Sequence, residues 1–441
     1  MLGLLPAFRR DPPGTLLQLA REYGDVVYFR LGPQRAILFN RPTHVQDLLI
    51  TNAHKFTKSR LLQRAKILLG EGLLTNEGKF HLRQRRLAQP AFHRDRLKAY
   101  SQVMAEYADR AASRWQEGET RDMAQEMMRL TLAVVAKTLF SADVESEASE
   151  VGQALTDVLG LFDLMLVPGT AFLQHLPLPA MRRFNRALKQ LNGIIYGIIR
   201  EHRESGKDAG DLLSMLMMAA DDQGDGSRMN DKQLRDEAMT LFLAGHETTA
   251  VALTWTWYLL SQHPQAAAKL REELETVLDG RLPAFDDLPR LPYTEMVMAE
   301  SMRLYPPAWG ISRLAIEAHE IDGFPIAKGT LCLLSPYVMH RNPVFFADPE
   351  RFDPERWMPE ARETRPKYSY FPFGAGARIC IGERFAWTEG ILILATIAQK
   401  WKMNLAPDQQ IAHLAQITLR TRYGMRMQLS GVNLKSRLIP G

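Results

Sequence analysis

The sequence has only two cysteines, Cys332 and Cys380, among 441 residues. This scarcity excludes a disulfide framework and any Cys-x-x-Cys zinc site, and it favours a reducing compartment, so we predict a cytoplasmic location. Long apolar runs are also missing. The opening MLGLLPAF is about eight residues long, whereas a membrane span needs about twenty. We therefore predict no membrane span in this chain.

Repeats, low-complexity segments and an obvious interdomain linker are missing as well, so we expect one folded unit. Hydrophobic residues make up 46% and charged residues 24%, which is typical of a packed globular protein. The 55 basic and 50 acidic residues give a net charge of +5. This small excess is compatible with an acidic partner or simply with a solvated basic face.

Local patterns predict a mainly α chain with a small β part. Alternation in DVVYFRLGPQRAILFN, with Gly32-Pro33 at its centre, predicts a hairpin. Helical periodicity dominates from about residue 80 to 305. The polar stretch 221–230 ends in Asn230, a good N-cap for a long helix from about Asp231 to Gln262.

Strands are predicted again within 312–335, around the turn signal Asp322-Gly323. Residues 341–378 show no sustained period and are predicted to form a long ordered loop. A helix is expected after Cys380, and the alternation in ITLRTRYGMRM predicts a final hairpin.

Cys380 lies in YFPFGAGARICIGERFAW, where glycines and aromatics surround it. A dinucleotide loop is excluded because the third glycine of G-x-G-x-x-G would fall on Ile379. A catalytic cysteine needs a histidine, and none is close in sequence. A buried structural cysteine would not require so many small neighbours. That structural interpretation suits Cys332, which lies in the apolar GTLCLLSP.

A metal ligand explains the surroundings of Cys380 better. The helix that follows would direct its free N–H groups and its positive dipole end at a thiolate. Gly376 and Gly382 would let backbone amides approach, and Phe373 would shield the sulfur from water. A single thiolate ligand suggests heme iron, where cysteine favours cleavage of the O–O bond.

The pattern Phe373-x-x-Gly376-x-Arg378-x-Cys380-x-Gly382 resembles the heme-binding loop of the cytochrome P-450 family. The resemblance extends over nearly the whole chain and implies a soluble, bacterial-type member. It implies a single-domain, mainly α prism, with heme b held between the long central helix and the helix after Cys380, and dioxygen as co-substrate. The implied parts are a β-richer segment at about 20–45 and a helical part at about 80–305. A β and heme-loop part follows at about 306–382, and a proximal helix with a C-terminal hairpin at about 382–430.

Two further motifs match the family. Glu300 and Arg303 lie three residues apart and can pair on a helix; the resemblance adds Arg356 and implies a buried structural triad. In LFLAGHETTA, residues 241–250, a zinc-protease motif is excluded because Ala250 replaces the second histidine.

A helical glycine beside two threonines is costly and therefore suggests a site. Ala244 and Gly245 would leave room for dioxygen beside the heme. The resemblance assigns an alcohol role to Thr248 and an acid role to Glu247, which together would relay protons. His246 is expected to point away.

The resemblance also implies cations for the heme propionates, namely Arg378, Arg313, Arg85 and, where many relatives have Trp, His81. It implies an apolar substrate lining made of Leu69, Leu73, Phe162, Phe172, Phe242, Ala308, Trp309, Ile311, Ile417 and Thr418. Each of these lining residues could equally belong to the ordinary core.

The sequence contains no nucleotide fingerprint and no flavin or iron–sulfur domain, so a separate reductant is expected. The resemblance implies a ferredoxin or flavodoxin with its NAD(P)H reductase. A basic segment could dock that partner, and its members are Arg83, Arg85, Arg86, Arg94, Arg96 and Lys98.

We therefore predict a heme-thiolate monooxygenase that hydroxylates or epoxidises a lipophilic molecule such as a fatty acid, terpenoid or steroid. A peroxide-driven peroxygenase is one alternative, although Glu247 and Thr248 would then be dispensable. A non-enzymatic heme sensor or carrier is another, and it leaves the same pair unexplained. Nucleic-acid binding is supported only by the basic charge, because no recognition motif is present.

Overall fold

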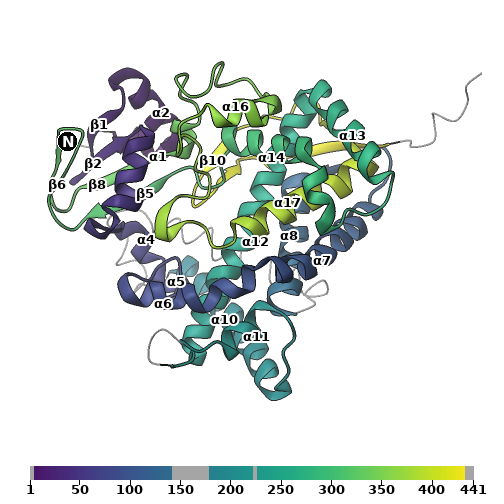
Figure 1. Ribbon diagram of the computed structural model, residues 1–441, viewed down its shortest axis with the longest axis horizontal. Helices are drawn as coiled ribbons and strands as arrows, with labels where there is room; N and C mark the ends of the chain where they lie inside the picture. The colour runs from purple at the N-terminus through teal and green to yellow at the C-terminus, as the bar shows by residue number, and fades with distance from the viewer. Residues whose placement is uncertain (1–3, 142–177, 222–225, 433–441) are drawn as a thin grey trace, which may run out of the picture. The chain divides into compact units, whose positions relative to one another are not determined.

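A computed structural model describes residues 4–141, 178–221 and 226–432 (Figure 1). The chain packs as two compact units. The first unit contains Met1–Thr57, Ser101–Leu130 and Thr248–Gly441, and the second contains Lys58–Tyr100 and Thr131–Glu247. The single-domain boundaries expected from the sequence stay a prediction.

The main sheet has the strand order β1-β2-β8-β5-β3. The bounds of these strands are Val26–Leu31, Gln34–Phe39, Leu331–Leu334, Ile311–Ala315 and Phe56–Lys58, respectively. The predicted hairpin is confirmed, because β1 and β2 pair antiparallel from Val26 opposite Phe39 to Leu31 opposite Gln34. Gly32 takes a positive φ of 59° at the turn, a conformation that glycine adopts without strain.

Two N-terminal helices, α1 (Leu5–Arg10) and α2 (Pro12–Tyr23), pack beside this sheet (Figure 1). Leu16 and Leu19 of α2 share a buried cluster with Val27 and Leu38 of the strands. The predicted turn at Asp322-Gly323 is also present: it joins β6 (His319–Ile321) to β7 (Phe324–Ile326), and both turn residues have positive φ.

The helix after Cys380, α17 (Glu383–Lys400), is buried along almost its whole length. It lies beside α13 (Pro264–Leu278) and α14 (Pro292–Leu304), as Figure 1 shows. This packing explains why the run GILILATIA is apolar on every face rather than amphipathic.

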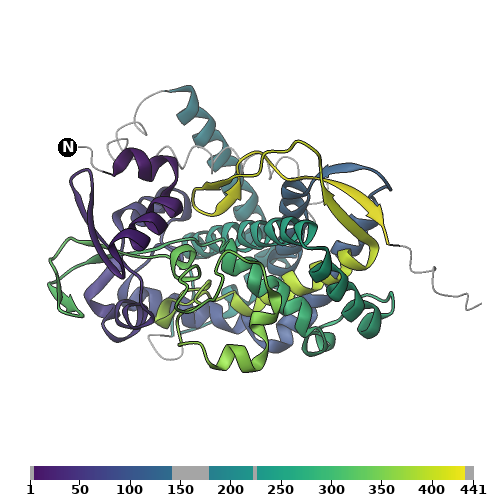
Figure 2. The same ribbon diagram turned by 90° about the horizontal axis from the view of Figure 1, so that it is seen from above.

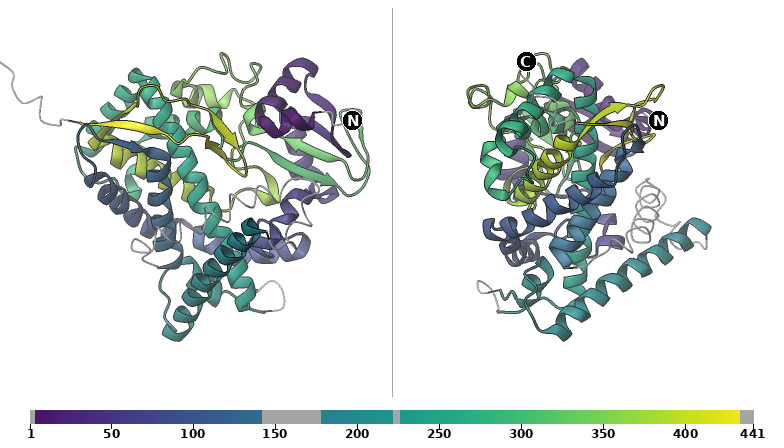
Figure 3. Two further views of the ribbon diagram at one scale, coloured as in Figure 1. Left: turned by 180° about the vertical axis from the view of Figure 1, so that it is seen from behind. Right: turned by 90° about the vertical axis from the view of Figure 1, so that its right-hand side faces the viewer.

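The second unit is helical. Its helices include α4 (Arg60–Arg64), α5 (Lys66–Leu69), α6 (Gly78–Ala88), α10 (Pro179–Ser205) and α11 (Leu212–Met218). Figure 3 shows α10 as one uninterrupted helix. Two other helices, α7 (Arg94–Ser113) and α8 (Met123–Phe140), contribute residues to both units.

The long helix α12 spans Asp231–Gln262, as the sequence predicted. Its start is fixed locally by reciprocal hydrogen bonds: the Gln233 amide N–H donates to Asn230 Oδ1 at 2.9 Å, and the Asn230 N–H donates to Gln233 Oε1 at 3.0 Å. This capping box satisfies two N–H groups that the helix itself cannot pair.

The predicted C-terminal hairpin is wrong in its pairing. β11 (Leu419–Thr421) pairs with β10 (His413–Ala415), whereas β12 (Arg426–Gly431) pairs with β9 (Trp401–Leu405) and β4 (Thr120–Asp122). Figure 2 shows β4, in blue, beside the yellow C-terminal strands. The local alternation was real, but the partner strands come from distant segments.

The region 341–378 is more regular than predicted. Short helical turns occur there at Pro354–Trp357, Pro359–Glu363 and Gly376–Arg378. Other short elements are Pro42–Gln46, Asp47–Thr51, Ala53–Lys55, Gln89–Phe92, Phe285–Arg290 and Pro336–Met339.

Candidate functional site

The Cys380 loop is held close to the backbone of residues 47–51. Gly376 has a φ of 71°, and a β-carbon at that position would overlap the carbonyl oxygen of Leu49. The Cys380 N–H donates to the Phe373 carbonyl at 2.9 Å, which closes the loop on itself. Only glycine allows this path, so Gly376 has a structural reason of its own.

The two cysteines differ sharply in environment. Cys380 is exposed, whereas Cys332 is buried in the sheet, where burial raises the pKa of its thiol to about 12. Cys332 is therefore an inert core residue at neutral pH. Cys380 lies immediately before α17, which begins at Glu383, and this places it near the positive end of the helix dipole.

One face of α12 is open in an otherwise buried stretch. Between Leu234 and Trp257, only Ala244, Gly245 and Thr248 are not buried. Positions i, i+1 and i+4 lie on one side of a helix. A flat prosthetic group on this face would meet two small residues and one hydroxyl group.

Gly245 also has a packing role that the sequence did not reveal. A β-carbon there would lie 3.1 Å from Cγ2 of Val135, so glycine lets α8 approach α12. One turn away from Val135, the Thr131 hydroxyl donates to the His246 carbonyl at 2.8 Å. His246 itself is buried, and its Nδ1 lies 3.0 Å from the Phe242 carbonyl. The neighbouring Glu247 is buried as well.

The structure brings Glu300, Arg303 and Arg356 together in the core of the first unit. Both Glu300 and Arg303 are fully buried, and Glu300 accepts from Arg303 Nε at 2.7 Å and Nη2 at 2.8 Å. Arg356 Nε lies 3.3 Å from the same carboxylate. The Asp353 N–H and the Trp357 indole N–H also donate to Glu300, at 2.9 and 3.0 Å.

This cluster reaches the Cys380 loop through His340. Arg303 Nη1 donates to the His340 carbonyl at 2.8 Å, and the Phe371 N–H donates to His340 Nε2 at 3.0 Å. Burial, with the charges of Arg303 and Arg341, holds the pKa of His340 well below its usual range. His340 is therefore neutral and can act as the acceptor that fixes the segment entering the loop.

Sequence reasoning missed Glu389. This carboxyl group is fully buried in α17, and burial raises its pKa to about 8, while the nearby Thr249 hydroxyl acts in the opposite direction. It is therefore mostly protonated at neutral pH. The signal was present, because Glu389 is the sole charge in the run WTEGILILATIA.

The four predicted propionate partners have different surroundings. His81 is buried rather than exposed at the surface, and its Nδ1 lies 2.9 Å from Asn76 Oδ1. A propionate would therefore meet Nε2. Arg313 Nη1 donates to the Ser312 carbonyl at 3.0 Å, and Arg85 and Arg378 are half-buried.

The predicted substrate residues fall into several groups. Leu69, Leu73, Phe242 and Thr418 are buried, Ile417 is exposed, and Ala308, Trp309 and Ile311 are partly buried. The segments around Pro307 and Thr418 adjoin, because Leu419 N–H donates to the Pro307 carbonyl at 3.0 Å and the Trp309 indole donates to the Gln416 carbonyl at 3.0 Å. Phe162 and Phe172 lie outside the described residues.

Several cations of the predicted docking segment are paired internally. Arg83 and Arg86 lie 3.5 and 2.9 Å from the Asp221 carboxylate, and Arg96 lies 3.5 Å from Asp208. These three charges are therefore largely neutralised within the second unit. Arg94 and Lys98 are exposed.

Within the described ranges, no helix is both long and apolar enough to cross a bilayer. Across the same residues, no three His, Cys, Asp or Glu side chains gather as a metal site would require. The single exposed thiol of Cys380 thus differs in kind from a zinc or multi-carboxylate centre.

Comparison with known proteins gives a consistent result. The family model described as Cytochrome P450 matches residues 1–421. Cyclooctatin synthase from Streptomyces melanosporofaciens is 42% identical over 90% of this chain and 87% of its own length. Cyclooctat-9-en-7-ol 5-monooxygenase from the same organism is 38% identical over 92% of this chain and 88% of its own. Pentalenene oxygenase from Streptomyces avermitilis is 38% identical over 92% and 90%.

The fold comparison agrees. The crystal structure of the cytochrome P450DA heme domain matches with a TM-score of 0.87 at 28% identity, covering 96% of this chain and 94% of that one. The long helix, the small sheets and the glycine-bounded cysteine loop are thus those of a known architecture. The chain belongs to the cytochrome P450 family, whose members are oxidoreductases that use heme iron and incorporate oxygen.

Proposed function

We propose that this protein is a heme b-dependent monooxygenase that inserts one atom of dioxygen into a lipophilic, terpenoid-like olefin or alcohol. The observation that carries the proposal is the exposed Cys380 thiol on a loop whose path requires glycine at position 376. Heme held by this thiolate would supply dioxygen activation and cleavage of the O–O bond. The remaining chemistry belongs to the residues of the chain.

Binding of the prosthetic group is assigned to two sets of residues. Cys380 is the thiolate ligand, and the loop residues Phe373, Gly376 and Gly382 shape the approach. The propionates are assigned to Arg85, Arg313, Arg378 and, through Nε2, His81. Glu300, Arg303 and Arg356 act at a distance by fixing the segment that leads to the loop.

Proton delivery is assigned to α12. Thr248 lies on the open face of the helix with Ala244 and Gly245, where a hydroxyl can hold a proton for transfer. Glu247 is the adjacent acid, and its burial limits direct exchange with bulk water. The pair would pass protons toward dioxygen while the two small residues leave space for it.

The substrate class rests on the apolar lining and on the names of the relatives. Leu69, Leu73 and Phe242 offer hydrocarbon surface, and none of them can bind a charge. Two similar proteins carry the names of an olefinic alcohol and an olefin, cyclooctat-9-en-7-ol and pentalenene. A polycyclic hydrocarbon framework is therefore preferred to a fatty acid, whose carboxylate would need a cation.

Electrons are assigned to a separate acidic ferredoxin or flavodoxin. Arg94 and Lys98 are exposed members of the basic segment and would contribute to docking. Arg83, Arg86 and Arg96 contribute less, because acids of the same unit already neutralise them.

The first experiment is the spectrum of the dithionite-reduced, carbon monoxide-bound protein beside a Cys380→Ala variant. A strongly red-shifted Soret band that disappears in the variant supports thiolate ligation, and a histidine-like spectrum in the wild type contradicts it. Pentalenene is then supplied with dioxygen, a ferredoxin and its reductase. Incorporation of one ¹⁸O atom from ¹⁸O₂ supports the proposed reaction.

The peroxygenase alternative is tested with the same preparation. Turnover with hydrogen peroxide alone that equals turnover with dioxygen and reductase, and that survives Thr248→Ala and Glu247→Gln, would favour the alternative. Loss of the dioxygen-driven reaction in both variants would favour the monooxygenase.

A further inference from the structure

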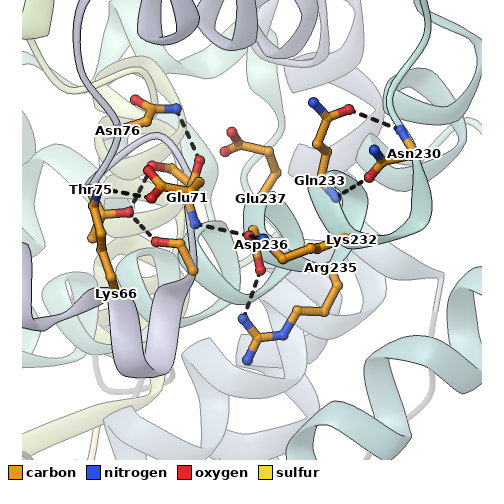
Figure 4. A network of polar contacts seen from close by, with 12 residues as sticks. Lys66, Glu71, Thr75, Asn76, Asn230, Lys232, Gln233, Arg235, Asp236 and Glu237 are labelled. Carbon is orange, nitrogen blue, oxygen red and sulfur yellow. Dashed lines mark hydrogen bonds and ion pairs between the residues drawn. The ribbon is translucent and has the colours of Figure 1, made fainter.

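The loop between α5 and α6 is fastened to the start of α12 by three successive side chains of that helix. Arg235 Nη2 donates to the Leu68 carbonyl at 2.8 Å, the Glu71 N–H donates to Asp236 Oδ2 at 2.9 Å, and the Leu73 N–H donates to Glu237 Oε2 at 2.9 Å. Figure 4 shows Arg235, Asp236 and Glu237 in a row beside this loop. All of these residues belong to the second unit.

The loop has glycine where a side chain would separate it from the helix. Gly70 has a φ of 58°, and a β-carbon there would overlap the Asp236 carboxylate. A β-carbon at Gly72 would overlap the Thr240 hydroxyl. The contact is therefore built into both partners, and the two acids are buried by it, with exposed fractions of 4% for Asp236 and 0% for Glu237.

Glu237 is the deepest member of this contact and accepts on both oxygens. Gln84 Nε2 donates to Oε1 at 3.0 Å, opposite the Leu73 N–H on Oε2. Arg83 Nη1 donates to Gln84 Oε1 at 2.9 Å, which fixes the orientation of that amide. Two donors thus face Glu237, and only a carboxylate can satisfy both.

The loop also has a fixed inner side. The buried Lys58 ammonium donates to the Leu73 carbonyl at 3.1 Å and to the Asn76 carbonyl at 3.0 Å. Leu73 is therefore held at its N–H by Glu237 and at its carbonyl by Lys58. Such a main chain cannot shift by one residue or rotate without breaking buried hydrogen bonds.

We propose that Asp236 and Glu237 are positioning residues that hold Leu69 and Leu73 in place against the substrate and thereby set which hydrocarbons the enzyme accepts. This inference rests on the proposed function, in which those two leucines line the substrate site. Neither acid contacts the substrate; each acts through the loop backbone. The acids fix the position of the loop, and the position of the loop decides which substrates fit.

The contact of Asp236 and Glu237 with the loop, which we call the clamp, is also sensitive to pH. Burial raises the pKa of Glu237 to about 7, and Asp236 adds to this, while the Leu73 N–H, Gln84 and Lys58 oppose it. Arg83 reaches the group only through Gln84. Because the carboxylate form accepts both hydrogen bonds, protonation below about pH 7 removes one of them. Exchange of the Leu73 amide, corrected for its intrinsic rate, should therefore be faster at pH 6 than at pH 8.

The direct test is hydrogen–deuterium exchange of the heme-loaded protein and its Glu237→Gln variant. Glutamine can accept from only one of the two facing donors, so we expect exchange in residues 71–76 to rise roughly tenfold, the effect of losing one buried hydrogen bond. The matched control is Glu71→Gln, which removes the ion pair with Lys66 at 2.8 Å but leaves the Glu71 N–H on Asp236. The control should behave like the wild type.

A second readout measures the effect on the substrate site. Imidazole and 4-phenylimidazole both bind heme iron through nitrogen, and the phenyl ring of the second adds an apolar group beside the heme. We expect Glu237→Gln to weaken 4-phenylimidazole by roughly tenfold and to leave imidazole unchanged. The carbon monoxide spectrum should also stay unchanged, because the clamp is remote from Cys380 in sequence and role.

A double variant that exchanges the acid and the amide gives the rescue. When Glu237→Gln is combined with Gln84→Glu, the amide oxygen at position 237 accepts from the Leu73 N–H, and its NH2 group donates to the carboxylate at position 84. That carboxylate also accepts from Arg83. Exchange and azole binding should return toward the wild type.

If hydrogen–deuterium exchange in residues 71–76 is unchanged in Glu237→Gln, the clamp is overturned. If exchange rises but 4-phenylimidazole binds as it does to the wild type, the role of the clamp in substrate specificity is overturned. If the wild-type protein lacks the thiolate spectrum, the proposed function is overturned instead. The exchange measurement then tests only whether the two acids hold the loop.

Discussion

The buried pair of Glu300 and Arg303 offers the sharpest test of how the cysteine loop is supported. Glu300→Gln keeps the shape of the side chain but removes its charge, and it directs an NH2 group at N–H donors. Arg303 would then be buried with no full counter-charge, because Glu300 is its ion-pair partner at 2.7 Å and both side chains have 0% exposure.

The expected cost follows from that geometry. Breaking a fully buried ion pair by removing one member costs about 3–5 kcal/mol, since the remaining charge keeps its desolvation penalty. The donors from Asp353 and Trp357, at 2.9 and 3.0 Å, place the cost toward the upper end. Because a typical domain is stable by only about 5–15 kcal/mol, we expect a large loss of stability and of retained heme.

The assay is urea unfolding followed by circular dichroism and by the Soret band, with heme content determined beforehand. The matched control is Glu295→Gln in the same helix, because Glu295 pairs with Arg362 at 3.9 Å with 48% and 69% of the two side chains exposed. That variant should lose under about 0.5 kcal/mol. If the stability of Glu300→Gln lies within about 1 kcal/mol of the control, the reasoning about buried charge is refuted.

Further predictions follow from the loop, the proximal helix and the docking segment. Gly376→Ala should lose most of its heme, because its β-carbon overlaps the Leu49 carbonyl. Gly374→Ala has a similar φ of 76°, but its β-carbon would only contact Ile311 Cδ1 at an ordinary 3.6 Å, so it should retain far more heme. Equal heme contents in the two variants would contradict the steric argument. The pKa of Glu389 rises from 4.5 to about 8 on folding. The contribution of this group to the free energy of unfolding is therefore fully present below pH 4.5 and is lost as the pH rises through 8, by roughly 4 to 5 kcal/mol in total. Melting temperatures of Glu389→Gln should therefore fall less than those of the wild type between pH 5 and pH 9, and parallel curves would refute a buried neutral carboxyl. Lys98→Glu should slow reduction by an acidic ferredoxin several-fold at low salt and hardly at about 0.5 M, as stopped-flow measurement would show, whereas an unchanged rate at low salt would remove this segment from the docking surface.

Features with strong local signals were predictable from the sequence. The bounds of α12 agree because the capping box at Asn230 and Gln233 is formed by neighbouring residues. The hairpin Val26–Phe39 agrees because alternation and a glycine turn act within a few residues. The spacing around Cys380 identified the family for the same reason.

Features that depend on distant segments were not predictable. The C-terminal strands β11 and β12 alternate as a hairpin would, yet they pair with other strands. Three of the basic side chains proposed for docking are neutralised by acids more than a hundred residues away, such as Asp221 and Asp208. The sequence shows which side chains are charged, but it does not show which oppositely charged side chains lie beside them in the folded protein.

The sequence by itself determined the long helix, the first hairpin and the cysteine loop, because backbone geometry, capping and glycine conformation act over a few residues. Only the tertiary structure decided which acids are buried. Asp236 and Glu237 look like ordinary surface charges in DKQLRDEAM, and Glu389 looks like an exception in an apolar helix. Their pKa values and roles depend on desolvation and on donors from other segments, and packing alone brings these together.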